Sequence, residues 1–329
     1  MTGPAWNPGQ GSPQAGTIEV LEPGLLTTVQ DLGRYGFQRH GFSPSGAADP
    51  AALILGNRLV GNDPGAAALE ITILGPRLRF TAETAIALTG ADLGAVLDGE
   101  PVPVGVTVRV PPGGELAFRG GRRGCRSYLC VAGGIDVPQL LGSRSTDLWA
   151  GIGGYRGRPL RAGDRLPLGP AGRPAAALAG RSVQWTFVPD EIVLRVVPGP
   201  QWEWFPAEAV ERFFGSVYHV RPDSDRSGVR LEGPAIARKA RELLSEGQTL
   251  GAIQIPPDGR PIVLMAGRAT VGGYPKLGIV ITPDIGWLAQ ARPGDRVRFE
   301  RIELDEALEL YRQWWRTLHR MPIAPGEGG

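Results

Sequence analysis

Residues 69–99 read LEITILGPRLRFTAETAIALTGADLGAVLDG, and this stretch decides the fold class. Short apolar runs alternate in it with breaks at glycine, proline and aspartate, which is typical of short elements rather than long helices. The Asp98-Gly99 pair is the most direct signal of a tight hairpin turn in the chain. The stretch therefore predicts short antiparallel strands that close into sandwiches or barrels.

Similar runs recur along the chain, as in TIEVLEPG, VTVRVPPGGELAF, RSYLCVAGG, IVLRVVPGP and DRVRFERI. GDR followed by alternating apolar residues occurs twice, so the two halves of the chain end alike. We therefore predict a mainly β protein with two β domains in tandem. The predicted division is a disordered tail over 1–17, a first domain over 18–172, a linker over 173–190, a second domain over 191–303 and a helix over 304–320.

Helices are few. The segment DPAALILGNRLVGN has Asp49 as a predicted N-cap, Pro50 at the first helical position and Gly61 as the stop. FPAEAVERFF begins in the same way. The C-terminal ELDEALELYRQWWRTLHR predicts a helix with one apolar stripe, interpreted as core or as a contact between subunits, that consists of Leu304, Leu308, Tyr311, Trp315 and Leu318.

Composition excludes some classes of partner. A net charge of +2 gives no electrostatic reason to expect nucleic acid or an anionic membrane. No apolar run reaches the length of a membrane span, and the first 17 residues lack the apolar segment of a secretory signal. Cys125 and Cys130 are five residues apart on a predicted strand, so they point to opposite faces and cannot pair. Two reduced thiols favour a cytoplasmic location.

The usual catalytic signatures are absent from the sequence. Neither Lys239 nor Lys276 lies in a Walker A setting, and GIGGYRG at 151–157 lacks the dinucleotide-binding spacing. Three histidines without a cysteine or carboxylate cluster predict no metal site. GFSPSG misses the nucleophile elbow by one residue. The chain therefore shows no self-contained catalytic machinery.

Four polar, glycine-rich segments remain: TTVQDLGRYGFQRHGFSPSG at 27–46, LTGAD at 88–92, SEGQTLGAIQIPPDG at 245–259 and TVGGYPKLG at 270–278. Glycines let the backbone approach a ligand closely, and short donors and acceptors lie beside them. The pattern predicts a site for a small polar ligand with amide or carboxylate groups.

Each candidate also has a plain structural interpretation. Asp31 and Arg34 are alternatively an internal ion pair that holds a loop, and His40 is alternatively an ordinary surface or core histidine. Asp92 is alternatively a turn residue. Lys276 either binds an anion or has no chemical role.

The motifs TVQDLGRYGFQRHG, SGAADPAALILGNRLVGN, AALEITILGP, ALTGADLGA, YLCVAGGIDVPQLLGSRST, SEGQTLGAIQIPPDGRPIVL and GGYPKLG resemble the biotin-dependent carboxyltransferase-like family. This family includes the C subunit of 5-oxoprolinase, KipA and allophanate hydrolase subunit 2. The resemblance extends from about Glu19 to Arg301. It implies two tandem cyclophilin-like β-barrel domains and a partner, the B subunit or KipI-like protein.

The resemblance implies three alternative functions. The first is the C subunit of an ATP-dependent 5-oxoprolinase, which opens 5-oxo-L-proline to L-glutamate with the A and B subunits and uses ATP with Mg at the level of the complex. The second is a carboxyltransferase half-module that acts on a small amide such as urea. The third is a KipA-like regulator that binds a kinase-inhibitor partner without catalysis. No Met-Lys dipeptide is present, so biotin in the second alternative would be carried by another protein.

The lactam-opening function assigns roles to the candidates as expectations. Asp31, Arg34 and Lys276 are the catalytic candidates, and positive groups would neutralise a phosphorylated amide oxygen. The substrate-binding candidates are Gln30, His40, Ser45, Thr89, Asp92, Arg126, Glu246, Gln254, Gly272, Gly273 and Tyr274. The turn GRATVGGYPK departs from the usual DRQTTGGYPK at three positions, Gly267, Ala269 and Val271.

Overall fold

The computed structural model describes residues 16–121 and 123–326 and divides them into two compact units. The first unit comprises the chain up to Arg34, residues 50–188 and the end of the chain from His319; the second comprises residues 35–49 and 189–318. The predicted domains were continuous in sequence, whereas residues 35–49 group with the second unit and residues 173–188 with the first. The tail predicted over 1–17 lies almost wholly outside the described residues.

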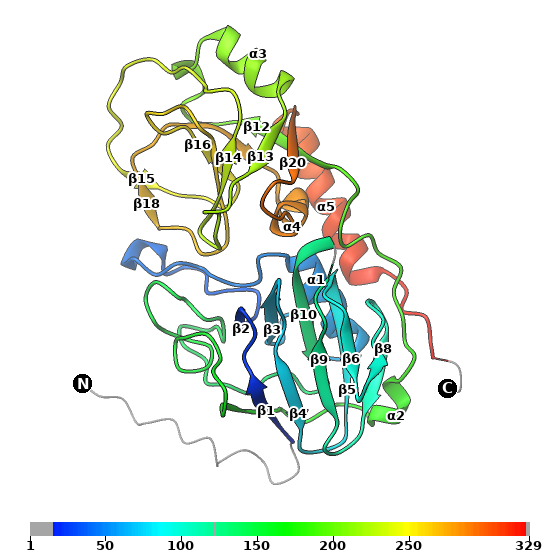
Figure 1. The fold of residues 1–329 in the computed structure, drawn as a ribbon. Helices are drawn as coiled ribbons and strands as arrows, with labels where there is room; N and C mark the ends of the chain where they lie inside the picture. Colours follow the sequence, from blue (N-terminus) through cyan, green and yellow to red (C-terminus); the bar gives the residue numbers. More distant parts are fainter. Residues whose placement is uncertain (1–15, 122, 327–329) are drawn as a thin grey trace, which may run out of the picture. The chain divides into compact units, whose positions relative to one another are not determined.

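The first unit contains two antiparallel sheets (Figure 1). The six-stranded sheet has the order β11-β1-β4-β9-β6-β7, with bounds Thr17–Glu22 (β1), Arg77–Phe80 (β4), Ala95–Leu97 (β6), Glu100–Pro101 (β7), Glu115–Phe118 (β9) and Arg165–Pro167 (β11). The five-stranded sheet has the order β2-β3-β10-β5-β8, with bounds Leu26–Gln30 (β2), Ala68–Thr72 (β3), Thr84–Asp92 (β5), Thr107–Val110 (β8) and Arg123–Val131 (β10). The predicted hairpin is confirmed, since Asp98 and Gly99 join β6 to β7 with φ of 50° and 93°.

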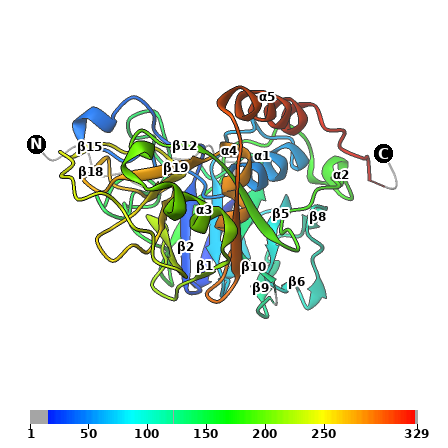
Figure 2. The same cartoon turned by 90° about the horizontal axis from the view of Figure 1, so that it is seen from above.

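One core fills the space between the inner faces of these sheets. Ile18 and Phe80 enter it from the six-stranded sheet, and Leu69, Ile86 and Leu129 enter it from the five-stranded sheet. Strand side chains alternate between faces, so the outer face of the five-stranded sheet carries the residues in between. Helix α1 (Pro50–Leu59) packs on β5 and β10 of this sheet (Figures 1 and 2).

The second unit is a closed barrel of strands β12-β19-β16-β17-β14-β13-β20. Parallel pairing of β12 with β20 closes it, and the other neighbours are antiparallel. The bounds are Ile192–Pro198 (β12), Tyr218–Val220 (β13), Gly228–Glu232 (β14), Ala252–Gln254 (β16), Ile262–Leu264 (β17), Lys276–Val280 (β19) and Arg296–Arg301 (β20). Two short strands, β15 (Glu246–Gly247) and β18 (Val271–Gly272), form a separate ribbon. The prediction of a mainly β fold is confirmed.

Aromatic packing fills one side of the barrel core. Phe213 and Phe299 stack with ring centroids 4.5 Å apart, and Tyr218 meets Phe299 edge-on at 5.8 Å. Phe213 comes from α3, the helix predicted in FPAEAVERFF. The other helical bounds are Ala175–Leu178 (α2), Ala207–Gly215 (α3), Thr282–Ala289 (α4), Leu304–Arg320 (α5), Gln38–His40 (η1) and Trp202–Trp204 (η2).

Helix α5 differs in part from the prediction of a single buried stripe. Leu318 is fully buried, whereas the other four stripe residues are exposed. Cys125 and Cys130 are both buried and form no disulfide with each other, as expected. Across the described residues, no helix has the length and apolar character needed to cross a membrane.

Candidate functional site

Asp31 organises the loop that follows β2. Its Oδ1 accepts hydrogen bonds from the Gly33 amide (2.7 Å) and from the hydroxyls of Ser143 (2.7 Å) and Ser145 (2.5 Å), and its Oδ2 accepts one from the Arg144 amide (2.5 Å). A carboxylate with four donors has little capacity left for a ligand. Asp31 therefore positions the segment 143–146 against the end of β2.

Arg34 is nearly inaccessible, with 1% of its surface exposed. Nη2 donates to the Ser145 carbonyl oxygen, while Nε and Nη1 have no hydrogen-bond partner among the described residues. Burial lowers the pKa of Arg34, and the charges of Asp147 and Asp31 oppose that shift. A Cβ at Gly153 would lie 2.5 Å from Nη2, so only glycine lets the loop backbone pass this close.

The outer face of the five-stranded sheet carries polar side chains beside these two. Gln30 is fully buried; its Nε2 donates to Thr28 Oγ1 (3.0 Å) and to the Thr146 carbonyl oxygen (3.2 Å), and its Oε1 has no partner in the described chain. An amide oxygen buried without a donor is costly unless a ligand or water supplies one. Gln30 thus offers an acceptor for an N–H group.

A buried carboxylate lies on the same face. Glu70 in β3 accepts a 2.8 Å hydrogen bond from the Tyr128 hydroxyl, and Arg126 Nε lies 4.0 Å from its other oxygen. Glu70 and Tyr128 were not among the predicted site residues. The sequence does contain a signal for Glu70. Side chains of a strand alternate between its two faces, and Glu70 interrupts the apolar run LEITI on the face opposite Leu69 and Ile71.

Two predicted residues of the first unit have structural partners. Thr89 lies opposite Tyr128 in the register of β5 and β10, but its buried hydroxyl donates to the Ala52 carbonyl oxygen of α1 (2.8 Å). Asp92 is exposed and accepts a hydrogen bond from the Gly94 amide (2.8 Å). Asp92 therefore has the geometry of a turn residue, which was its alternative interpretation.

The second unit contains an independent polar cluster around Lys276, the first residue of β19. The buried Lys276 Nζ donates to Glu246 Oε1, and Gln201 Nε2 donates to the same oxygen at 2.8 Å. The Lys276 amide donates to Gln201 Oε1 at 3.1 Å, which fixes the orientation of that side chain. The hydrogen bond from Lys276 lowers the pKa of Glu246, and Gln201 adds to the effect against the opposing effect of burial.

Two glutamine amides extend this cluster. Gln254 Nε2 donates to Gln248 Oε1 (3.1 Å), and Gln248 Nε2 donates to the Gly272 carbonyl oxygen (3.0 Å). A Cβ at Gly272 would come within 2.9 Å of Gln248 Nε2 and 3.0 Å of Gln254 Nε2. The backbone of β18 therefore lies directly against both amides.

Arg268 is another buried cation of this unit, besides Lys276 and Arg226. Its Nε donates to the Gln248 carbonyl oxygen at 3.5 Å, and burial lowers its pKa. The Gln38 amide reaches the same carbonyl oxygen at 3.4 Å. Gln201, Gln248 and Arg268 were not predicted, because no motif marks a neutral amide or a single arginine as part of a site.

The remaining predicted residues of the second unit are more scattered. His40 is exposed and accepts a hydrogen bond from its neighbour Arg39 (3.0 Å), as expected for an ordinary surface histidine. Ser45 is buried with φ of 53°, and its Oγ has no partner in the described residues. Gly273 and Tyr274 are exposed.

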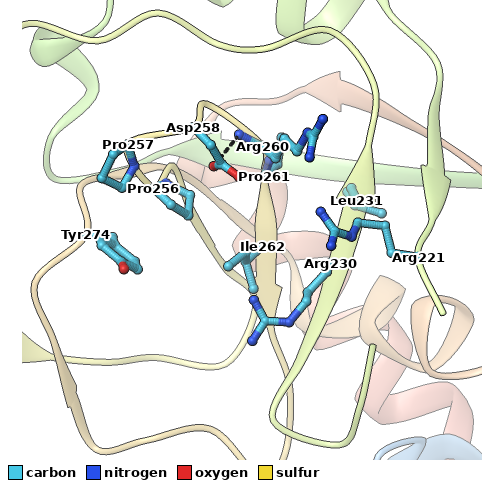
Figure 3. Close-up of a pocket in the computed structure, with 10 residues that line it drawn as sticks. All are labelled: Arg221, Arg230, Leu231, Pro256, Pro257, Asp258, Arg260, Pro261, Ile262 and Tyr274. Carbon is cyan, nitrogen blue, oxygen red and sulfur yellow. Dashed lines mark hydrogen bonds between the residues drawn. The ribbon is translucent and has the colours of Figure 1, made fainter. Parts of the chain in front are cut away.

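Tyr274 lines a separate pocket of about 360 Å³ (Figure 3). Three arginines surround this pocket, yet each has a carboxylate close by: Arg221 pairs with Asp223 at 3.0 Å, Arg260 with Glu232 at 3.3 Å, and Arg230 with Asp223 at 3.8 Å. These exposed pairs neutralise the guanidinium charge. The pocket therefore does not have the electrostatics of a specific anion site.

The structure also shows the surroundings of the three positions at which the turn 267–276 departs from the usual DRQTTGGYPK. Gly267 donates its amide to the Arg226 carbonyl oxygen (2.8 Å), and a Cβ there would lie 3.2 Å from that oxygen. Ala269 and Val271 are exposed.

The described residues of each unit thus include a group of mostly buried polar side chains. We call the first the sheet cluster, formed by Gln30, Asp31, Arg34, Glu70, Arg126 and Tyr128. We call the second the barrel cluster, formed by Gln201, Glu246, Gln248, Gln254, Arg268 and Lys276. Both combine cationic donors with amides and a carboxylate, which is the chemistry that recognises small amides and carboxylic acids.

The buried thiol of Cys130 and the possible metal ligands of the described residues do not add to the candidate site. Burial raises the pKa of Cys130, which keeps the thiol protonated and unreactive. Over the described residues, no three histidine, cysteine, aspartate or glutamate side chains are grouped to hold a metal ion.

Comparisons with known proteins show the family of this chain. The family model of the carboxyltransferase domain, subdomain A and B, matches residues 40–301. The C subunit of 5-oxoprolinase from Escherichia coli is 42% identical over 294 residues, which cover 89% of this chain and 93% of that protein. The urea amidolyase of Lachancea kluyveri is 34% identical over 317 residues, which cover 89% of this chain and 17% of that enzyme.

Solved structures show the same fold. The crystal structure of TTHA0988 has a TM-score of 0.79 at 40% identity and covers 88% of this chain, which spans 56% of that longer chain. The K. lactis urea amidolyase has a TM-score of 0.85 at 32% identity and covers 92% of this chain, which spans 20% of that enzyme. The family-model match spans the barrel cluster and Glu70, Arg126 and Tyr128 of the sheet cluster, and it begins after Gln30, Asp31 and Arg34.

Proposed function

Because this chain belongs to the family of the carboxyltransferase domain, subdomain A and B, we propose that it is the C subunit of an ATP-dependent 5-oxoprolinase. In this proposal it opens 5-oxo-L-proline to L-glutamate together with the A and B subunits. The observation that carries the proposal is the nearly end-to-end match to the C subunit of the Escherichia coli 5-oxoprolinase, at 42% identity and 93% coverage of that protein.

The buried polar clusters suit such a substrate. A lactam acid presents one carbonyl oxygen, one N–H group and one carboxylate. In the sheet cluster, Arg34 Nε and Nη1 have no partner among the described residues, and in this proposal one of them donates a charge-assisted hydrogen bond to the substrate carboxylate. Gln30 Oε1 is an acceptor for the lactam N–H.

The barrel cluster, taken by itself, offers an alternative set of groups for such a substrate. Lys276 is held by Glu246 and would neutralise an oxygen that becomes negative when the amide is activated. Asp31 acts in this proposal as a positioning residue, because all its partners belong to the chain itself. ATP and Mg act at the level of the complex, and no residue of this chain is assigned to them.

A second candidate is a carboxyltransferase half-module that acts on a small amide such as urea. The match to urea amidolyases favours it, with a TM-score of 0.85 for the K. lactis enzyme. This chain covers only 20% of that enzyme, so the comparison says less about the whole reaction. Biotin would then be carried by another protein.

The test is ATP-dependent release of glutamate from 5-oxoproline by this chain purified together with its A and B partners. We expect activity that is lost when this chain is left out and restored when it is added back. A stable complex without lactam-dependent ATP hydrolysis would contradict the proposal. Urea-dependent decarboxylation of carboxybiotin by the same preparation would favour the second candidate, and activity with neither substrate would favour a regulatory role.

A further inference from the structure

Helix α5 carries an exposed row of large apolar side chains. Leu304, Leu308, Tyr311 and Trp315 are 61%, 43%, 40% and 41% exposed, and their spacing of 4, 3 and 4 residues places them on one stripe. A helix at the surface of a soluble unit normally presents polar residues outward. A continuous apolar stripe is therefore typical of a surface that another helix covers.

Other side chains attach α5 to its own chain. Ala307 is buried, and Leu310 packs against the small cluster of Ile281, Ile302 and Ala307. Leu318 follows Trp315 at the same spacing but is fully buried, so the exposed outer stripe consists of Leu304, Leu308, Tyr311 and Trp315. Figure 2 shows α5 as one continuous helix over its whole length.

Aromatic rings make up half of the outer stripe. The ring centroids of Tyr311 and Trp315 lie 6.4 Å apart with an interplanar angle of 26°, so the two rings stand side by side. Tyrosine and tryptophan are the residues most often found at the energetic centre of protein interfaces.

Charge is distributed unevenly along α5. Asp305, Glu306 and Glu309 lie in its first half, and Arg312, Arg316 and Arg320 lie in its second half. This distribution suits the helix dipole. It also makes the helix complementary to an antiparallel copy of itself, because each acidic half then faces a basic half.

We propose that α5 is a homodimer surface on which a second copy of this chain packs its own α5 in the antiparallel direction. A two-fold axis between residues 309 and 310 places Leu304 opposite Trp315 of the partner subunit, and Leu308 opposite Tyr311 of the partner subunit. In the same register, at the edge of the stripe, Asp305 lies close to Arg312 of the partner subunit. The whole outer stripe is thereby covered by one self-complementary contact.

The size of the outer stripe sets the affinity that we expect for the dimer. A helix of 17 residues is about 25 Å long, so a single helix pair falls at the low end of specific interfaces. We expect a dissociation constant on the order of micromolar.

The first test is the mass of the full chain by sedimentation equilibrium across a concentration series. We expect reversible dimerisation, which Leu308→Glu weakens at least about tenfold because it buries a charge in the stripe. Gln313→Lys is the matched control, since Gln313 is exposed on the same helix outside the stripe, and it should dimerise like the parent. A parent chain that stays monomeric throughout overturns the proposal and leaves the stripe for a different partner.

The second test uses charge reversal to identify the occupant. Asp305→Lys places an ammonium near Arg312 of the partner subunit, and Arg312→Glu places two acidic groups together, so each variant alone should dimerise less than the parent. A mixture of the two variants restores opposite-charge pairing and should recover dimers. Circular dichroism confirms that each variant folds. A mixture that dimerises no better than its components overturns the antiparallel arrangement.

Discussion

At the scale of single residues, Asp31 and Arg34 are three positions apart but differ in their surroundings. Asp31 accepts hydrogen bonds from four donors of its own chain, whereas Arg34 retains two buried N–H groups without a partner in the described residues. The first arrangement fixes a loop, and the second leaves capacity for a ligand. The expected Asp31–Arg34 ion pair is therefore replaced by two different roles.

The role of Asp31 predicts a large effect on stability. Asp31→Ala leaves several buried donors unsatisfied, and we expect the free energy of unfolding to fall by about 3 kcal/mol. Asp92→Ala is the matched control, because Asp92 is exposed and accepts a single hydrogen bond, and it should cost less than about 1 kcal/mol. Urea denaturation measures both. Equal losses for the two variants would contradict the positioning role.

The two lysines of the chain offer another matched pair. Lys276→Gln removes the buried ammonium from Glu246, and we expect turnover of the reconstituted complex to fall about 100-fold because a charge-stabilising group is lost. Lys239→Gln removes an exposed ammonium that donates to the Glu203 carbonyl oxygen, and turnover should stay within about twofold. Steady-state kinetics of lactam-dependent ATP hydrolysis compares them. Similar turnover for both variants argues against a role for Lys276.

Sequence reasoning located candidates that lie inside recognisable motifs better than those outside them. Lys276, Glu246 and Gln254 were predicted from motifs and lie in one cluster. Glu70 was missed because alternation shows which face a side chain occupies but does not show that the outer face is buried. Gln201 was missed because its contact with Glu246 joins residues 45 positions apart in the sequence.

At the scale of elements, the ribbon of β15 and β18 presents two glycines with different surroundings. Gly272→Ala would push a methyl group against the amides of Gln248 and Gln254, and we expect the catalytic efficiency to fall about tenfold while the fold persists. Gly247→Ala in the paired strand meets nothing within 4 Å and should leave the efficiency unchanged. The ratio of kcat to KM, with circular dichroism as the fold control, tests this. An unaffected Gly272→Ala variant would show that the amides are not part of the site.

The same ribbon predicts a dependence of stability on pH. The hydrogen bond from Lys276 holds the pKa of Glu246 below its usual value of 4.5, so ionised Glu246 stabilises the fold above that pH. This contribution is lost as the pH falls through the lowered folded-state pKa. The stability difference between the parent and Glu246→Gln should therefore be present near neutral pH and shrink in acid.

Thermal unfolding of both proteins from neutral pH into acid measures this difference. A Glu246→Gln difference that is independent of pH would contradict the tie to Lys276.

Strands were easier to predict than the helix α4 (Thr282–Ala289). The hairpin at Asp98-Gly99 and the first residue of α1, Pro50, both follow from local turn and capping chemistry. Helix α4 has Pro283 early, but its short sequence TPDIGWLA has no clear amphipathic period because most of its residues are buried. Tertiary burial rather than local pattern decides that element.

At the scale of the whole molecule, the limits of the two units could not be predicted from composition. The predicted boundary near residue 172 was based on the segment AGRPAAALAGRS, which is rich in alanine and glycine. A cue of this kind can only divide the chain into segments that are continuous in sequence. Residues 35–49 belong to the second unit although they lie inside the first in sequence. Ala48 packs in the barrel core, and Asp49 accepts a 2.9 Å hydrogen bond from Gln290.

This membership predicts that the second unit is incomplete without its distant segment. A fragment of residues 189–318 lacks Ala48, the Gly46 carbonyl oxygen that binds Arg226, and the Asp49 carboxylate. We expect it to unfold at a lower temperature than the same unit in the full chain, and to gain stability when a peptide of residues 35–49 is added. Circular dichroism melting with a scrambled peptide as control measures the gain. A fragment that melts like the full chain would contradict the assignment.

The membership of residues 35–49 in the second unit has a consequence for folding during synthesis. A ribosome releases this segment early, yet its barrel partners are translated only after residues 50–188. The first unit waits as well, because Ser182 pairs with Ala324 and Arg58 binds the Met321 carbonyl oxygen near the end of the chain. Neither unit is one continuous stretch of sequence, so a chain that stops between residues 188 and 318 would contain neither unit complete.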